Sequence, residues 1–169
     1  MSSPDYGRAK HVSERTVEIL IQNNSKSKVL TDAATFNYSG HLYNPPPPVI
    51  SPGEKGDAMF IKTRGAARGS VGILTFKYGS NQFSVLFSNP FDYNIFSIEY
   101  ALYISGVSEQ TDKYLYRKMY SQMKPQKNYA KEVLSARTRA ISVSGGGLVV
   151  SATMSNESHS IIKIDVRDT

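Results

Sequence analysis

The chain has 169 residues, of which 40% are apolar and 20% are charged, and 20 Lys and Arg residues against 14 Asp and Glu residues give it a formal net charge of +6. A chain of this length buries enough surface to fold as one domain without disulfides or a metal. Cysteine is absent, which excludes disulfide scaffolds, thiolate metal sites and cysteine nucleophiles.

Residues 1–14 form a short polar segment before the first predicted strand. Pro4 and Gly7 argue against a helix here, and the apolar stretch of a signal peptide is missing. Nowhere does the chain approach the ~18 apolar residues of a membrane-spanning helix. We therefore expect a soluble protein, cytosolic or secreted by a non-classical route, with a single β-sandwich domain over residues 15–169.

Short runs rich in Val, Ile, Tyr and Phe recur along the chain, and many are separated by Gly, Asn or Pro. Such runs are typical of the strands of a β-sandwich or barrel. In residues 162–167, Ile and Val alternate with charged residues, which predicts a strand with one buried face. The predicted strands cover residues 17–21, 28–38, 58–63, 71–78, 82–87, 98–104, 140–143, 148–154 and 160–166.

Two glycine-rich segments, residues 65–70 and 145–147, precede strands. Glycine loops that bind phosphate precede a helix, so we predict a hairpin turn at each segment. The four prolines at 45–48 lack backbone N–H donors and predict a stiff, extended connector in a surface loop.

One segment has helical periodicity. Thr111 and Asp112 provide N-cap chemistry, and apolar or aromatic residues follow at positions i, i+3, i+4 and i+7. The spacing predicts an amphipathic helix over residues 111–123 that ends before a proline. The residues of its apolar stripe are Tyr116, Met119, Tyr120 and Met123.

The sequence has no pattern typical of an enzyme. The histidines His11, His41 and His159 are far apart and have no partner at metal-ligand spacing, and the carboxylates are scattered. We therefore predict no catalytic residue, no cofactor and no metal site.

Positive charge is concentrated between residues 113 and 139, where tyrosines are interleaved and Glu132 is the single acid. Such a surface suits anionic lipids, phosphate-bearing headgroups or nucleic acid, and a solvated helix face is the plainer alternative. The predicted basic patch consists of Lys113, Arg117, Lys118 and Lys124.

The segment from Ser88 to Ser97 carries more aromatic residues than a solvated loop needs, in the order Ser-Asn-Pro-Phe-Asp-Tyr-Asn-Ile-Phe-Ser. It resembles the actinoporins, the sea-anemone cytolysins and their relatives, and its pattern is similar to that of actinoporin-like proteins of fishes. The resemblance extends to residues 38–40, 69–76 and 116–120, and covers most of the chain from about Arg15. It implies a mainly β, actinoporin-like sandwich flanked by one or two short α-helices.

The resemblance also implies a phosphocholine site made of Ser39, Val71, Ser88, Pro90, Phe96, Tyr116 and Tyr120. Phe96 stands where a Tyr is usual in the family, and packing roles are the alternative for Val71, Pro90 and the two tyrosines. The implied membrane-contact loop consists of Tyr93, Ile95, Phe96 and Tyr100. Anemone members carry tryptophans where Ile95 and the pair Glu99-Tyr100 stand, and this chain has no Trp.

We therefore expect a membrane-lipid-binding protein that recognises choline headgroups, such as that of sphingomyelin, and forms homo-oligomers on membranes. Pore formation in the family needs a long amphipathic N-terminal segment, so the polar residues 1–14 predict weak or absent pores. A lectin that binds glycans on the same fold is the alternative function. Nucleic-acid binding through the basic segment is a third hypothesis, and we expect no such partner.

Overall fold

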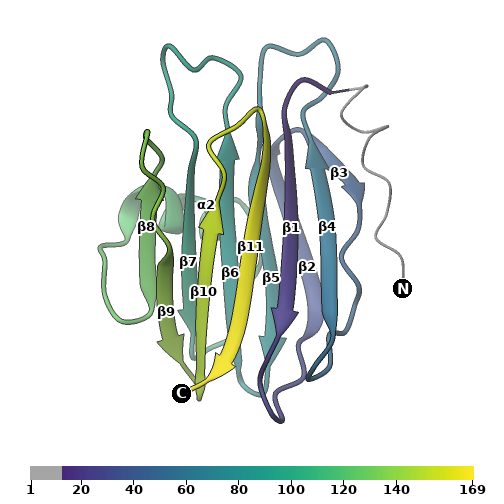
Figure 1. Cartoon of the computed structure of the whole chain (residues 1–169), viewed down its shortest axis with the longest axis vertical. Helices are drawn as coiled ribbons and strands as arrows, with labels where there is room; N and C mark the ends of the chain where they lie inside the picture. Colours follow the sequence, from purple (N-terminus) through teal and green to yellow (C-terminus); the bar gives the residue numbers. More distant parts are fainter. Residues whose placement is uncertain (1–12) are drawn as a thin grey trace.

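Two β-sheets lie face to face over residues 13–169, the part of the chain that the computed structural model describes (Figure 1). The six-stranded sheet has the order β3 (His41–Asn44), β4 (Lys55–Ile61), β1 (Thr16–Asn23), β11 (His159–Asp168), β10 (Leu148–Met154) and β9 (Ile141–Gly145). The five-stranded sheet has the order β2 (Thr31–Ser39), β5 (Ser70–Tyr78), β6 (Asn81–Asn89), β7 (Glu99–Ser105) and β8 (Tyr129–Val133). Neighbouring strands are antiparallel except β1 and β11, which run parallel.

The main hydrophobic core lies between the sheets. Along β11, Ile162, Ile164 and Val166 are buried in this core while the Lys and Arg residues between and after them are exposed. Across the interface, Phe60 of β4 meets Phe87 of β6 with ring centroids 4.4 Å apart. The predicted mainly β sandwich is confirmed. The strand with one buried face that the alternation in residues 162–167 predicts is also confirmed, as β11.

Every run predicted as a strand overlaps a strand of the structure, but the sequence did not indicate β3 and β8. Both are edge strands, because they end the strand order of their sheets. Edge strands are short and carry polar residues, and β3 has 4 residues while β8 reads Tyr-Ala-Lys-Glu-Val. Neither shows the apolar alternation on which the prediction depended.

The two glycine-rich segments differ from each other. Residues 145–147 form the hairpin turn between β9 and β10, as predicted, with φ of 59° at Gly146 and 85° at Gly147. The prediction for residues 65–70 is wrong, because this segment joins β4 to β5 and these strands belong to different sheets. At its end, a Cβ on Gly69 would lie 2.0 Å from the carbonyl oxygen of Asn89, so only glycine allows this crossing to pack against β6.

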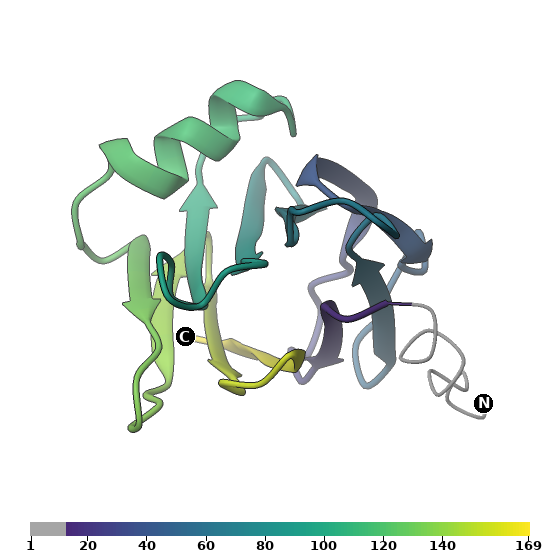
Figure 2. The same cartoon turned by 90° about the horizontal axis from the view of Figure 1, so that it is seen from above.

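The predicted helix is confirmed as α2 (Lys113–Arg117), which continues as a π-helical turn, η1 (Lys118–Gln122). It lies outside the five-stranded sheet (Figure 2). Asp112 caps the helix, and its Oδ1 accepts from the backbone N–H of Tyr114 at 3.0 Å and of Leu115 at 3.1 Å. The apolar stripe forms a second core against the outer face of the sheet, made of Leu115, Tyr116 and Met119 with Val71, Ile73, Leu86, Ala101, Tyr103 and Tyr129.

The polar segment predicted at residues 1–14, and the helix considered within it, lie outside the described residues apart from Ser13 and Glu14. Between residues 13 and 169, no helix has the length and apolar character needed to cross a membrane.

Candidate functional site

A row of side chains crosses the five-stranded sheet near one end. Ser39 of β2 lies opposite Val71 of β5, Val71 opposite Ser88 of β6, and Ser88 opposite Glu99 of β7. Directly opposed residues in a sheet share a face, and Val71 belongs to the core beneath the helix. This cross-strand row therefore lies on the helix side, and it brings together Ser39, Val71 and Ser88, three residues of the phosphocholine site that the resemblance implies.

Three tyrosines stack beside the row. The ring of Tyr38 lies 4.7 Å from that of Tyr116 at an interplanar angle of 13°, and Tyr116 lies 5.5 Å from Tyr120 at 15°. Tyr38 is 57% exposed, whereas Tyr116 is only 7% exposed. This tyrosine stack joins Tyr116 and Tyr120, both predicted, to Tyr38, which the sequence indicated only as part of the resemblance at residues 38–40.

The hydroxyls of Tyr116 and Tyr120 stay protonated at neutral pH. Burial raises the pKa of Tyr116, and Tyr120, Tyr38 and Glu99 raise it further. Burial also raises the pKa of Tyr120, again with help from Glu99 and Tyr38. Both side chains are therefore hydrogen-bond donors, which is the state that a phosphate oxygen requires.

Glu99 ends the row and forms an ion pair with Lys131 of β8. Lys131 Nζ lies 3.4 Å from Glu99 Oε1 and donates to the carbonyl oxygen of Tyr120 at 2.7 Å. The same ammonium lies 4.6 Å from the centre of the Tyr120 ring. The sequence places Lys131 in the basic segment and Glu99 where relatives carry a Trp, and it does not predict their pairing.

The other predicted pocket residues lie apart from the stack. Pro90 is buried directly after β6, and its Cα would lie 2.7 Å from a Cβ on Gly69. Ser39 Oγ donates to the Gly69 carbonyl at 3.1 Å, so the crossing segment supports the row from this side. Phe96 is 56% exposed, and the ring contacts within residues 13–169 do not join it to the tyrosine stack.

Residues 90–98 form a loop, here called the aromatic loop, that leaves the sheet after Asn89 and returns at Glu99. Its tip exposes large side chains: Tyr93 is 43% exposed, Ile95 70% and Phe96 56%. The loop keeps its shape through Asp92, which accepts from the backbone N–H of Asn94 through its side chain at 2.9 Å and of Phe96 through its carbonyl at 3.0 Å. An ordered apolar tip therefore projects from the end of the sheet that carries the row.

The base of the aromatic loop is tied to the start of β1 and to Ser158, the residue before β11. Asn89 is fully buried, and its Nδ2 donates to the carbonyls of Thr16 at 3.1 Å and Ser158 at 2.8 Å. Its Oδ1 accepts from the Tyr93 hydroxyl at 2.6 Å. Arg15 donates to the carbonyls of Pro90 and Phe91 at 3.1 and 2.8 Å, with its guanidinium 4.3 Å from the Tyr93 ring centre.

The assignment of Tyr100 to the membrane-contact loop is wrong. Tyr100 is fully buried in the core between the sheets, and its hydroxyl donates to the carbonyls of Arg139 at 2.9 Å and Ala152 at 3.0 Å. Successive residues of a strand point to opposite faces, so Tyr100 turns inward while Glu99 faces the helix. Tyr93, Ile95 and Phe96 are the predicted loop residues that reach solvent.

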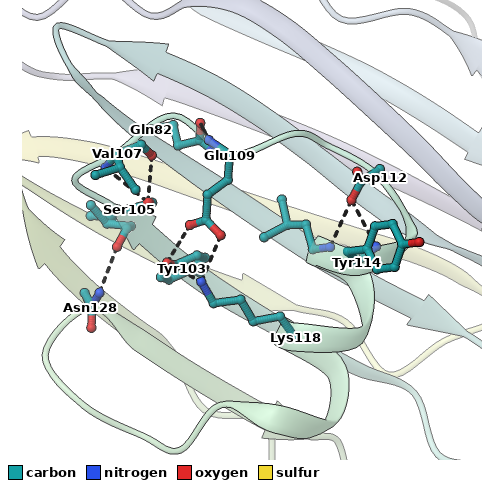
Figure 3. Close-up of polar contacts among 11 residues, drawn as sticks. Gln82, Tyr103, Ser105, Val107, Glu109, Asp112, Tyr114, Lys118 and Asn128 are labelled. Atoms are coloured by element: carbon teal, nitrogen blue, oxygen red, sulfur yellow. Dashed lines mark hydrogen bonds and ion pairs between the residues drawn. The ribbon is translucent and has the colours of Figure 1, made fainter.

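The prediction that Lys118 belongs to an exposed basic patch is wrong. Its ammonium donates to Glu109 at 2.8 Å and to the Tyr103 hydroxyl at 3.0 Å, so it is not a free cation (Figure 3). The Tyr103 hydroxyl in turn donates to the other Glu109 oxygen at 2.6 Å. This cluster fastens the helix to β7, while Lys113, Arg117 and Lys124 remain exposed.

Glu109 should make this attachment sensitive to acid. Burial raises the pKa of its carboxyl, but hydrogen bonds from Lys118 and Tyr103 outweigh burial and hold the pKa below the usual 4.5. The carboxylate therefore stabilises the fold above pH 4.5, and this contribution is lost as the pH falls through the lowered value. We expect Glu109→Gln to reduce the free energy of unfolding by ~1 kcal/mol at pH 7 and by less at pH 3, in urea titrations.

Glu54→Gln is the control, because Glu54 is exposed on a loop of the opposite sheet. A loss of stability in Glu109→Gln that is equal at both pH values would contradict the assigned role.

A groove of about 880 Å³ lies on the outer face of the six-stranded sheet, beside the proline tract. Pro45 and Pro47 line one part of it, and Lys55, Asp57 and Lys163 another. The prolines connect β3 to β4 in a partly exposed loop, as predicted. Its lining contains none of the residues predicted for the phosphocholine site, the membrane-contact loop or the basic patch.

Comparison with known proteins gives a consistent result. A sequence profile of the family described as "Sea anemone cytotoxic protein" matches residues 11–168. Hydra actinoporin-like toxin 5 from Hydra vulgaris is 36% identical over 73 residues, which are 43% of this chain and 39% of that protein. DELTA-alicitoxin-Pse1b from Phyllodiscus semoni is 38% identical over 66 residues, 38% of this chain and 29% of the toxin. The matches thus span well under half the length of these relatives.

Among solved structures, the lipid binding protein Nakanori has a similar fold. It superposes with a TM-score of 0.73 over 94% of this chain and 74% of Nakanori, at 13% sequence identity. At this identity the likeness establishes the shared architecture.

Proposed function

The chain belongs to the family of sea anemone cytotoxic proteins, and from this premise we propose that it binds membrane lipids by recognising phosphocholine headgroups, such as that of sphingomyelin. One observation carries the proposal: the tyrosine stack, the cross-strand row and the exposed tip of the aromatic loop share one end of the sandwich. A protein that holds a headgroup while resting on a bilayer needs these features side by side.

The chemistry of the stack suits a choline headgroup. A quaternary ammonium is attracted to each aromatic face by ~0.5–2 kcal/mol, and three tyrosine rings lie together here. The protonated hydroxyls of Tyr116 and Tyr120 can donate to phosphate oxygens, as can the hydroxyl of Ser88. One site thus offers partners for both ends of phosphocholine.

The aromatic loop supplies contact with the lipid interface. Tyr93, Ile95 and Phe96 are exposed at its tip, and aromatic and large apolar side chains favour the region between headgroups and acyl chains. The exposed cations Lys113, Arg117 and Lys124 lie on or just after the helix and add attraction to anionic lipids.

Substitutions at Tyr120 test the headgroup site. Tyr120→Ala removes an aromatic face, and we expect it to weaken binding to phosphatidylcholine vesicles about tenfold, measured by co-sedimentation. Tyr120→Phe keeps the face and removes one hydroxyl, so it should lose about threefold. Tyr43→Ala is the matched control, because Tyr43 is a partly exposed tyrosine of β3, on the other sheet.

Three comparisons would contradict or support the proposal. Equal binding to neutral vesicles with and without choline lipids would rule out headgroup recognition. Competition by free phosphocholine supports it, whereas competition by monosaccharides would favour the lectin alternative. Dye release from the same vesicles measures perforation separately.

A further inference from the structure

The ion pair between Glu99 and Lys131 lies inside the proposed headgroup site. Glu99 directly follows Ser88 in the cross-strand row, and Lys131 reaches it from the edge strand β8. The two side chains are mostly buried, with 12% of Glu99 and 26% of Lys131 exposed. An ion pair removed from water in this way is costly unless its charges have further partners.

The surroundings of the Lys131 ammonium form a binding site for a cation. It is held by the Glu99 carboxylate at 3.4 Å, the Tyr120 carbonyl at 2.7 Å and the Tyr120 ring at 4.6 Å. A carboxylate and an aromatic face are also the groups that attract a choline ammonium. The Lys131 ammonium therefore occupies a site whose groups could also bind the ammonium of a choline headgroup.

The carboxylate retains unused bonding capacity. Glu99 Oε1 is buried and accepts no hydrogen bond within residues 13–169, so the ion pair with Lys131 is what balances its charge. Buried polar atoms in folded proteins almost always have a hydrogen-bond partner. A carboxylate oxygen that lies beside an aromatic stack and accepts no hydrogen bond could accept one from, or pair with, a cationic group of a ligand.

We propose that this ion pair selects zwitterionic headgroups by exchanging partners. The headgroup ammonium forms an ion pair with Glu99, and the headgroup phosphate forms one with Lys131. The proposal rests on the proposed function, and it names the residues that set its specificity. A zwitterion replaces one ion pair by two, so no buried charge is left alone. An anionic headgroup without an ammonium could satisfy Lys131 only, and would leave the Glu99 carboxylate unpaired and close to its phosphate.

The test compares vesicles of phosphatidylcholine with vesicles of phosphatidylglycerol, whose headgroup has a phosphate and no ammonium. Glu99→Gln removes the repelling charge, and we expect the ratio of the two dissociation constants to shift about tenfold towards phosphatidylglycerol. The measurements are made at 0.15 M salt, where charges more than about 8 Å apart are largely screened.

Glu132→Gln is the matched control for Glu99→Gln. Glu132 neighbours Lys131 on β8 and pairs with the inward-facing Tyr100, so the same charge is removed from the opposite face of the strand. We expect this variant to shift the ratio less than threefold. An equal shift in both variants would overturn the proposal, because overall charge would then account for the effect.

Lys131→Met provides an independent arm. It leaves Glu99 without its cationic partner. The control is Lys163→Met, which removes an exposed lysine from the other sheet. We expect the affinity of Lys131→Met for phosphatidylglycerol to fall about tenfold further than that of the control. Melting temperatures establish that each variant is folded. If the unaltered chain does not bind phosphatidylcholine vesicles, the proposed function is wrong. If it binds them, but Glu99→Gln and Lys131→Met change lipid binding no more than their control variants do, only the proposed role of the ion pair is wrong.

Discussion

Replacing Ile95 and Phe96 together by Ser is expected to weaken binding to phosphatidylcholine vesicles at least about a hundredfold and to leave the melting temperature unchanged. These side chains are 70% and 56% exposed, so their removal costs the folded state little. Transferring one such side chain out of water is worth ~1.5–3 kcal/mol, and the lower value for each gives ~3 kcal/mol for the pair. Since 1.4 kcal/mol corresponds to tenfold, the loss exceeds a hundredfold.

Val107→Ser is the control for this variant. Val107 is 67% exposed and follows the end of β7, whereas the aromatic loop precedes its beginning, so the two sites lie at opposite ends of the strand. Vesicle co-sedimentation of both variants measures the difference. If Val107→Ser loses as much affinity as the double variant, binding depends on general apolar surface and the loop has no special role.

Asn89→Ala is expected to destabilise the fold by ~3 kcal/mol, the largest effect on stability that we predict. The amide is fully buried and makes three hydrogen bonds, two to backbone carbonyls of Thr16 and Ser158 and one to Tyr93. Leaving a buried polar group without its partner costs ~1–3 kcal/mol, and several groups are affected at once. For a domain of this size, the melting temperature should fall by roughly 6–12 °C.

Tyr93→Phe separates the contributions. It removes the hydroxyl at 2.6 Å from Asn89 Oδ1 and leaves the two bonds to the backbone intact, so we expect a loss of ~1 kcal/mol. Thermal unfolding followed by circular dichroism compares the two variants. A loss in Asn89→Ala no greater than that in Tyr93→Phe would mean that the backbone contacts of Asn89 contribute nothing to stability.

Local pattern was enough to predict most of the strands and the helix. The period of two in β11 and the stripe from Tyr116 to Met123 each require only neighbouring residues, and both are present as predicted. Alternation alone could not place Tyr100. Glu99 and Tyr100 are consecutive in a strand and face opposite sides, but the pattern does not say which of the two turns inward, and the resemblance favoured Tyr100 at the lipid, whereas Tyr100 is buried.

Other features depend on contacts between distant parts of the chain. The ion pairs of Lys118 and Lys131 could not be predicted locally, because their acidic partners, Glu109 and Glu99, lie on other elements. Likewise, residues 65–70 have the composition of a tight turn, and only the layering of the sheets shows that they cross from one to the other. Only the resemblance grouped Ser39, Val71 and Ser88 in one site, since nothing local relates β2, β5 and β6, and their alignment in a row is seen only in the sheet register.

The parallel pairing of β1 with β11 has a mechanical consequence. The two strands run side by side from Thr16 opposite His159 to Asn23 opposite Val166, and β4 holds the other side of β1. Tension applied between the chain ahead of Thr16 and the chain after Asp168 would slide these strands past each other. Their hydrogen bonds would then resist together rather than open one after another, so the sandwich should behave as a stiff element under a pulling force along this axis.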